Sequence, residues 1–126
     1  QAIPPPQDGK DPLPLAMESL GEKIGRDLQT RLKLPEGRAA AVLAWRVASR
    51  LAGLRLRVEE EGERTVVDHL YCPLWDRFRQ ERELSCPRFC EPLARGMARV
   101  VAPGCEMEMV RAATLEAPCA KALSGK

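Results

Sequence analysis

The residues of this sequence best suited to chemistry are its cysteines, which all lie in the second half of the chain. They are Cys72, Cys86, Cys90, Cys105 and Cys119. The first two are each followed by proline, which the first turn of a helix tolerates well. Thiols at the starts of structural elements act as metal ligands or as nucleophiles. We therefore expect a functional site in this half of the chain.

We expect Cys72, Cys86, Cys90 and Cys119 to converge on one metal site. Cys86 and Cys90 are separated by three residues, so their sulfur atoms share one face of a helix. Four thiolates hold either a 4Fe-4S iron–sulfur cluster or a tetrahedral zinc ion. The sequence favours the cluster, because its single histidine offers zinc little mixed ligation. Cys105 is the spare thiol or a substitute for one of the four.

Two other interpretations of these residues remain open. Several of the thiols can be buried structural cysteines, which are common in folded proteins. Alternatively, Cys86 or Cys90 is a nucleophile and His69, the only histidine, is its general base. His69 can equally be a strand residue with an ordinary hydrogen bond.

Length and composition are those of a globular domain. The chain has 126 residues, of which 44% are hydrophobic and 30% charged, with 20 Lys and Arg against 18 Asp and Glu. Balanced and dispersed charge argues against nucleic-acid binding. No apolar run approaches the roughly 20 residues of a membrane span. An odd number of cysteines fits a disulfide framework poorly, so we expect a reducing, cytoplasmic location.

The first half of the chain predicts an arm and two helices. Residues 1–14 are rich in proline and are expected to form a flexible arm. Apolar residues recur at spacings of three and four over 15–34 and 36–51, which predicts two helices that pack as an antiparallel hairpin. Gly21 and Gly25 either weaken the first helix or let another backbone approach closely.

The pattern then changes to the two-residue period of strands. Strands are expected over 54–59, 64–71, 106–115 and 119–123. Two further helices are expected between them, one from Pro73 and one that starts near Cys86 and ends before Pro103. The predicted fold class of residues 15–126 is a single α+β domain: a helix pair, then an antiparallel sheet in the order ββ-αα-ββ, with helices on one face.

The cysteine-bearing segments also carry a family resemblance. The Cys72-Pro73 pair, the stretch 86–90 and the closing strands with Cys119 resemble the L-2-amino-thiazoline-4-carboxylic acid hydrolase-like family, over roughly residues 66–123. They are more distantly similar to four-vinyl-reductase domains, which are small ligand-binding modules. The resemblance implies hydrolysis of a cyclic carbon–nitrogen bond, with these four cysteines as nucleophile or ligands.

Three functions follow from the sequence. The favoured one is a small cysteine-ligated metal protein that binds an iron–sulfur cluster, as an electron-transfer accessory or sensor subunit. The second is a cysteine-dependent hydrolase of a thiazoline-type substrate. The third is a zinc-stabilised, ligand-binding regulatory module. A protein partner or homo-oligomer is expected in each case, because open sheets have unpaired edges.

Overall fold

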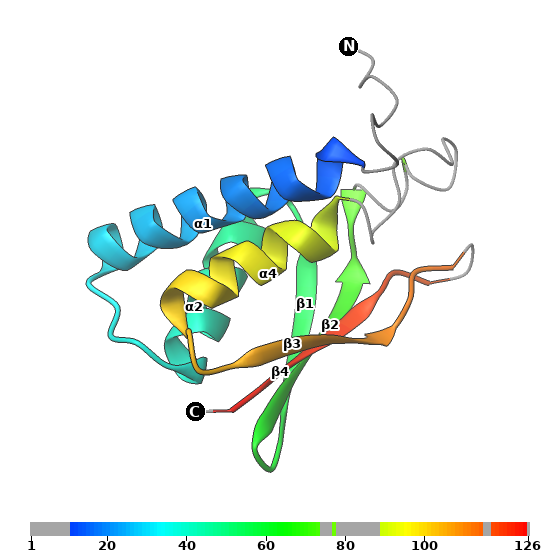
Figure 1. Cartoon of the computed structure of the whole chain (residues 1–126). Coiled ribbons are helices and arrows are strands. Elements are labelled where there is room, and N and C mark those ends of the chain that lie inside the picture. Colours follow the sequence, from blue (N-terminus) through cyan, green and yellow to red (C-terminus); the bar gives the residue numbers. More distant parts are fainter. Residues whose placement is uncertain (1–10, 74–76, 78–88, 115–116, 126) are drawn as a thin grey trace.

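The computed structural model describes residues 11–73, 77, 89–114 and 117–125. Its helices are α1 (Pro12–Leu32), α2 (Arg38–Leu51) and α4 (Cys90–Val101), and its strands are β1 (Arg55–Glu61), β2 (Arg64–Tyr71), β3 (Glu106–Arg111) and β4 (Ala120–Ser124). Figure 1 shows these helices on one side of a twisted sheet. The α+β class is therefore confirmed. None of the described helices is both long and apolar enough to cross a bilayer.

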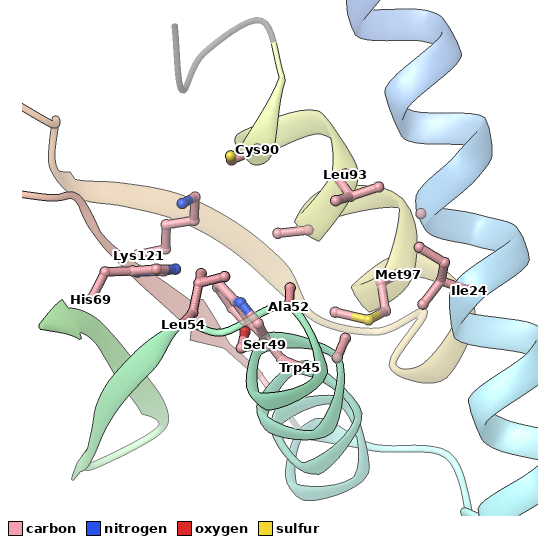
Figure 2. A pocket seen from close by; sticks show the side chains of 13 residues that line it. Ile24, Trp45, Ser49, Ala52, Leu54, His69, Cys90, Leu93, Met97 and Lys121 are labelled. Atoms are coloured by element: carbon pink, nitrogen blue, oxygen red, sulfur yellow. The ribbon is translucent and has the colours of Figure 1, made fainter. Parts of the chain in front are cut away.

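The sheet is antiparallel, with the strand order β1-β2-β4-β3. Opposite residues in such pairs point to the same face, and Val67 is opposite both Val58 and Lys121. Val67 is fully buried. His69 and Lys121 line the space between sheet and helices (Figure 2). Val67 and His69 of β2 therefore face the helices, whereas Asp68 lies on the other face of the sheet.

Helices α1 and α4 pack backbone to backbone at two glycines. A Cβ atom at Gly21 would lie 2.0 Å from the carbonyl oxygen of Leu93, and one at Gly96 would lie 2.1 Å from that of Glu18. Both distances are too short for any side chain, so of the two alternatives for Gly21 the close backbone approach is the one observed. The prediction that α1 and α2 pack on each other as a hairpin is wrong. Helix α1 packs chiefly on α4 and only slightly on α2.

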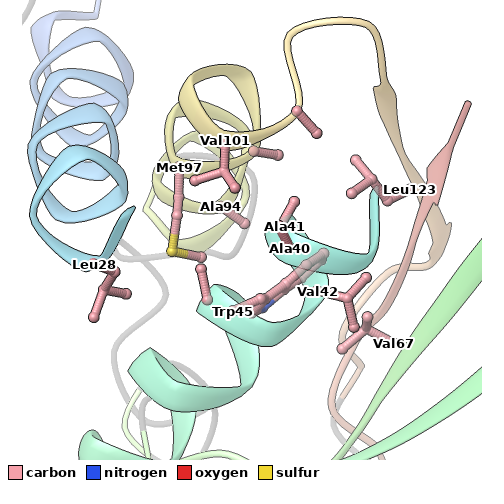
Figure 3. Close-up of a cluster of buried hydrophobic side chains, with 13 residues drawn as sticks. Leu28, Ala40, Ala41, Val42, Trp45, Val67, Ala94, Met97, Val101 and Leu123 are labelled. Carbon is pink, nitrogen blue, oxygen red and sulfur yellow. The ribbon is translucent and has the colours of Figure 1, made fainter. Parts of the chain in front are cut away.

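The main core fills the space between α2, α4 and the sheet. Trp45 of α2 and Met97 of α4 are nearly inaccessible to solvent, and Val101, Val67 and Leu123 are fully buried. Figure 3 shows the two helical faces converging on the side chains of the two central strands. This arrangement fixes α2 and α4 relative to β2 and β4, which carry the polar residues of the site.

Two predicted details need correction. Helix α1 begins at Pro12 rather than at residue 15, because Asp11 accepts a hydrogen bond from the Leu13 amide at 3.1 Å and proline suits the first turn. The predicted order ββ-αα-ββ is also not observed: the described elements run αα-ββ-α-ββ. The helix expected from Pro73 lies almost entirely outside the described residues, as do residues 1–10 of the predicted arm.

Candidate functional site

A pocket of about 110 Å³ lies between the three described helices and the inner face of the sheet. Most of its wall is apolar, and the larger apolar side chains come from α1, α2, α4 and the segment before β1. They are Ile24, Trp45, Leu54, Leu93 and Met97. Figure 2 shows Ile24, Leu93 and Met97 on one side of this space and the sheet residues on the other. The pocket therefore offers an apolar surface to whatever occupies it.

The sheet side of the pocket carries a buried polar cluster made of His69, Lys121 and Cys119. The Lys121 Nζ atom donates a hydrogen bond to Cys119 Sγ at 2.8 Å, and His69 Nδ1 lies 3.8 Å from the same sulfur. The His69 amide also donates to the Cys119 carbonyl oxygen at 3.0 Å. His69 is 5% exposed and Lys121 is fully buried. Strands β2 and β4 thus hold these groups firmly against the pocket.

Lys121 is the least expected member of this cluster. An ammonium group has three N–H donors, and its transfer from water to the protein interior is costly unless it is paired and hydrogen-bonded. Within the described part of the chain, the ammonium has one hydrogen bond, to Cys119, and no carboxylate partner. The Lys121 side chain lines the pocket, so two N–H groups remain for an acceptor that enters it.

Ser49 and Cys90 add two further polar atoms to the wall. Ser49 lies near the end of α2, and Cys90 is the first residue of α4. Cys90 also packs against Cys119, together with Phe89 and Met109. Two of the four predicted metal ligands are therefore neighbours, beside the predicted base His69.

The other cysteines are placed differently. Cys72 is buried directly after β2, and Cys86 lies outside the described residues. Cys105 precedes β3, and Cys119 precedes β4, so the antiparallel register puts them at opposite ends of this strand pair. Cys105 therefore does not join Cys119 in a common site. Burial raises the pKa of the Cys105 thiol, although the charge of Arg38 opposes the shift.

The described residues do not assemble a metal site by themselves. Over 11–73, 77, 89–114 and 117–125, no three His, Cys, Asp or Glu side chains are grouped closely enough to hold an ion. The ammonium of Lys121 also occupies one side of the Cys119 sulfur. Because Cys86 is not among these residues, the four-cysteine cluster stays a prediction.

Sequence reasoning missed Lys121 and Ser49. A signal for Lys121 was present: in the last strand, Cys119, Lys121 and Leu123 alternate with alanines, and a two-residue period puts the three on one face. An inward cysteine and leucine imply an inward lysine. Ser49 gave no comparable signal, because serine near the end of a helix is commonly solvated.

No protein-family model, curated protein or solved structure matches this chain. The resemblance to the thiazoline hydrolase-like family therefore stays a prediction, and the argument about function depends on the site itself.

Proposed function

We propose that this chain is a ligand-binding module whose pocket takes a small apolar carboxylate. The observation that carries the proposal is the fully buried Lys121 at the polar side of an otherwise apolar pocket. A carboxylate would accept the two remaining Lys121 N–H groups, and its apolar body would lie against Leu93 and Met97. Charge-assisted hydrogen bonds of this kind are strong when they are shielded from water.

The volume limits the part of the ligand that lies inside the pocket to one ring or a short chain. An enclosed apolar cavity of about 150 Å³ in another protein binds benzene, whereas this pocket of about 110 Å³ is partly open to solvent, so part of a ligand can project from it. Benzoate and a short-chain fatty acid are therefore suitable probes.

The test compares charged and neutral probes. We expect calorimetry to detect benzoate binding, and Lys121→Met to weaken it by about 10- to 100-fold, because hydrogen bonds to charged groups contribute about 1.5–3 kcal/mol. Benzyl alcohol, which lacks the charge, should bind the variant and the original protein alike. Lys23→Met removes the same charge from the exposed side of α1 and should leave benzoate binding unchanged.

A second variant tests the apolar part of the pocket. Ala48→Leu adds three carbon atoms to a residue of the wall, so both benzoate and benzyl alcohol should bind more weakly. Failure of both probes to bind the unmodified protein would refute the proposal. Equal benzoate affinity in Lys121→Met would remove the assigned role of the lysine.

A cysteine-dependent hydrolase is the second candidate, because Cys90 and His69 line the same pocket. Cys90 would attack the ring carbon of a cyclic carbon–nitrogen bond, and His69 would carry the thiol proton to the departing nitrogen. A thiazoline carboxylate is itself a single-ring carboxylate and would fit the ligand class above. Ring opening that is lost in Cys90→Ser and kept in Cys105→Ser would support catalysis; binding without turnover would exclude it.

The predicted iron–sulfur or zinc site is a separate proposal. It is supported by the packing of Cys90 against Cys119 and depends on Cys72 and Cys86 joining them. Elemental analysis of anaerobically purified protein measures it directly. Stoichiometric iron or zinc that is lost in Cys72→Ser would support the site, and metal-free protein would eliminate it.

A further inference from the structure

Strand β1 is an open edge of the sheet. Among the strands that the structure describes, the order β1-β2-β4-β3 leaves one side of β1 without a neighbour. Strand β1 alternates between exposed and half-buried positions before ending in exposed glutamates. An edge strand presents a row of backbone donors and acceptors to any chain that can pair with it. The seven residues of β1 contain no proline, so each of them has a backbone N–H group as well as a carbonyl group.

Strand β1 carries positive charges in its first half and negative charges in its second half. Arg55 and Arg57 lie in its first half, and Glu59 and Glu61 lie in its second half. Arg57, Glu59 and Glu61 occupy alternate positions and therefore share the outer face of the sheet, whereas Arg55 lies beyond an irregularity of the strand and lines a hollow beside α2. Val58 separates the basic half from the acidic half. A strand with this pattern is complementary to an antiparallel copy of itself.

We propose that two copies of this chain associate through antiparallel pairing of their β1 strands, with Val58 on the two-fold axis. In this register, Arg57 lies opposite Glu59 of the second copy. Two-fold symmetry repeats this pair, so the outer face of the interface contains two oppositely charged pairs. The two four-stranded sheets become one continuous sheet.

The same charges disfavour the competing arrangements. A parallel pairing in register would put arginine beside arginine and glutamate beside glutamate, and directly opposed like charges destabilise a strand pair. A shift of the antiparallel register by two residues would oppose Arg57 to Arg57 of the second copy, or Glu59 to Glu59 of the second copy. Charge thus selects both the direction and the register of pairing.

Contacts within one copy already orient the central arginine. Arg57 Nη2 lies 3.2 Å from Asp68 Oδ2, and Arg57 Nε lies 3.4 Å from Glu59 Oε1. The Arg57 and Glu59 side chains remain 59% and 56% exposed. They are therefore held at the outer face and still accessible to a second copy.

A hollow on the helix side of β1 also favours a second copy of this chain as the binding partner. It is lined by α2 and the start of β1, including Leu43, Val47, Arg46 and Arg50. Neither arginine has an ion pair among the residues that the structure describes. In the proposed register, Glu60 of the second copy lies opposite Leu56, another residue of this hollow. The second copy would thus bring an acidic side chain towards two arginines.

Charge reversal tests the pairing. Sedimentation equilibrium should show a dimer for the unmodified protein, with a dissociation constant that rises with salt. Arg57→Glu and Glu59→Arg should each raise this constant at least about tenfold, because each replaces attractive cross-strand pairs with repulsive ones. Glu63→Arg, which reverses a charge in the turn after β1, should leave the constant unchanged.

Two combinations make the test independent of folding defects. The double variant Arg57→Glu/Glu59→Arg restores every opposite pair and should dimerise again. An equimolar mixture of the two single variants should form a heterodimer, since one copy is acidic at both positions and the other is basic. A monomeric unmodified protein, a dimer that survives Arg57→Glu, or a mixture that stays monomeric would each overturn the proposal.

Discussion

Charged side chains are paired with opposite charges on the outer face of the sheet, whereas on the inner face the charge of Lys121 is buried beside a cysteine sulfur. On the outer face, Asp68 accepts hydrogen bonds from Arg57 at 3.2 Å and from Arg111 at 2.6 Å, and Arg64 pairs with Glu108 at 2.9 Å. On the inner face, the ammonium of Lys121 is fully buried and has a cysteine sulfur as its hydrogen-bond acceptor. Surface ion pairs contribute little to stability, whereas a buried cation is costly. This contrast is the reason for proposing Lys121, rather than the more numerous outer charges, as the ligand-binding residue.

The largest effect should come from apolar packing on the inner face. Leu123→Ala removes a fully buried side chain from the core and should lower the free energy of unfolding by about 2–5 kcal/mol. Val110→Ala, at a 44% exposed position of β3, should cost less than about 1 kcal/mol. Urea denaturation of the two variants measures the difference. Equal losses would mean that the inner face is not the more tightly packed one.

An effect of opposite sign is expected at Lys121. Lys121→Met keeps the length of the side chain and removes its buried charge, so the ligand-free protein should gain about 1–2 kcal/mol of unfolding free energy. Thermal denaturation without ligand checks this gain. A clear loss of stability would show that the ammonium is needed for folding, and the argument for a functional lysine would then fail.

The smallest effect should come from the outer charges. Arg111→Met breaks the pair with Asp68 and the hydrogen bonds from Arg111 to the Pro118 carbonyl oxygen. Because Arg57 still contacts the Asp68 carboxylate, the loss of unfolding free energy should be only about 1 kcal/mol. The loss should shrink further in high salt, because exposed charges are screened. A loss as large as that of Leu123→Ala would contradict the distinction between the faces.

Local periodicity predicted most elements of this fold. The bounds of β2 and the end of α4 before Pro103 follow from residue spacing and type, although α4 begins at Cys90 rather than near Cys86. The chain leaves α2 through Gly53, which has a φ of 86°, a conformation that glycine adopts readily. Such features depend on a few neighbouring residues, which is why a single sequence reveals them.

Relations between distant segments could not be predicted in the same way. The two-residue period of a strand predicts that Val67 and His69 share a face, but it does not predict that helices cover this face. Residue spacing also does not predict that α1 packs on α4 rather than on α2. The site depends on these long-range contacts: His69 meets Cys119 because β2 pairs with β4, whereas thiol chemistry alone pointed to Cys72 and Cys86 as well.

The glycine contacts between α1 and α4 also limit where the size of the proposed ligand pocket could be changed. A larger residue at Gly21 or Gly96 would push the two helices apart instead of filling the cavity between them and the sheet. The separation of α1 and α4 is therefore set by main-chain contacts. Changes in ligand size would have to be engineered on α2 and just beyond it, at Ala48, Ser49 and Ala52, where side chains can vary without separating helices.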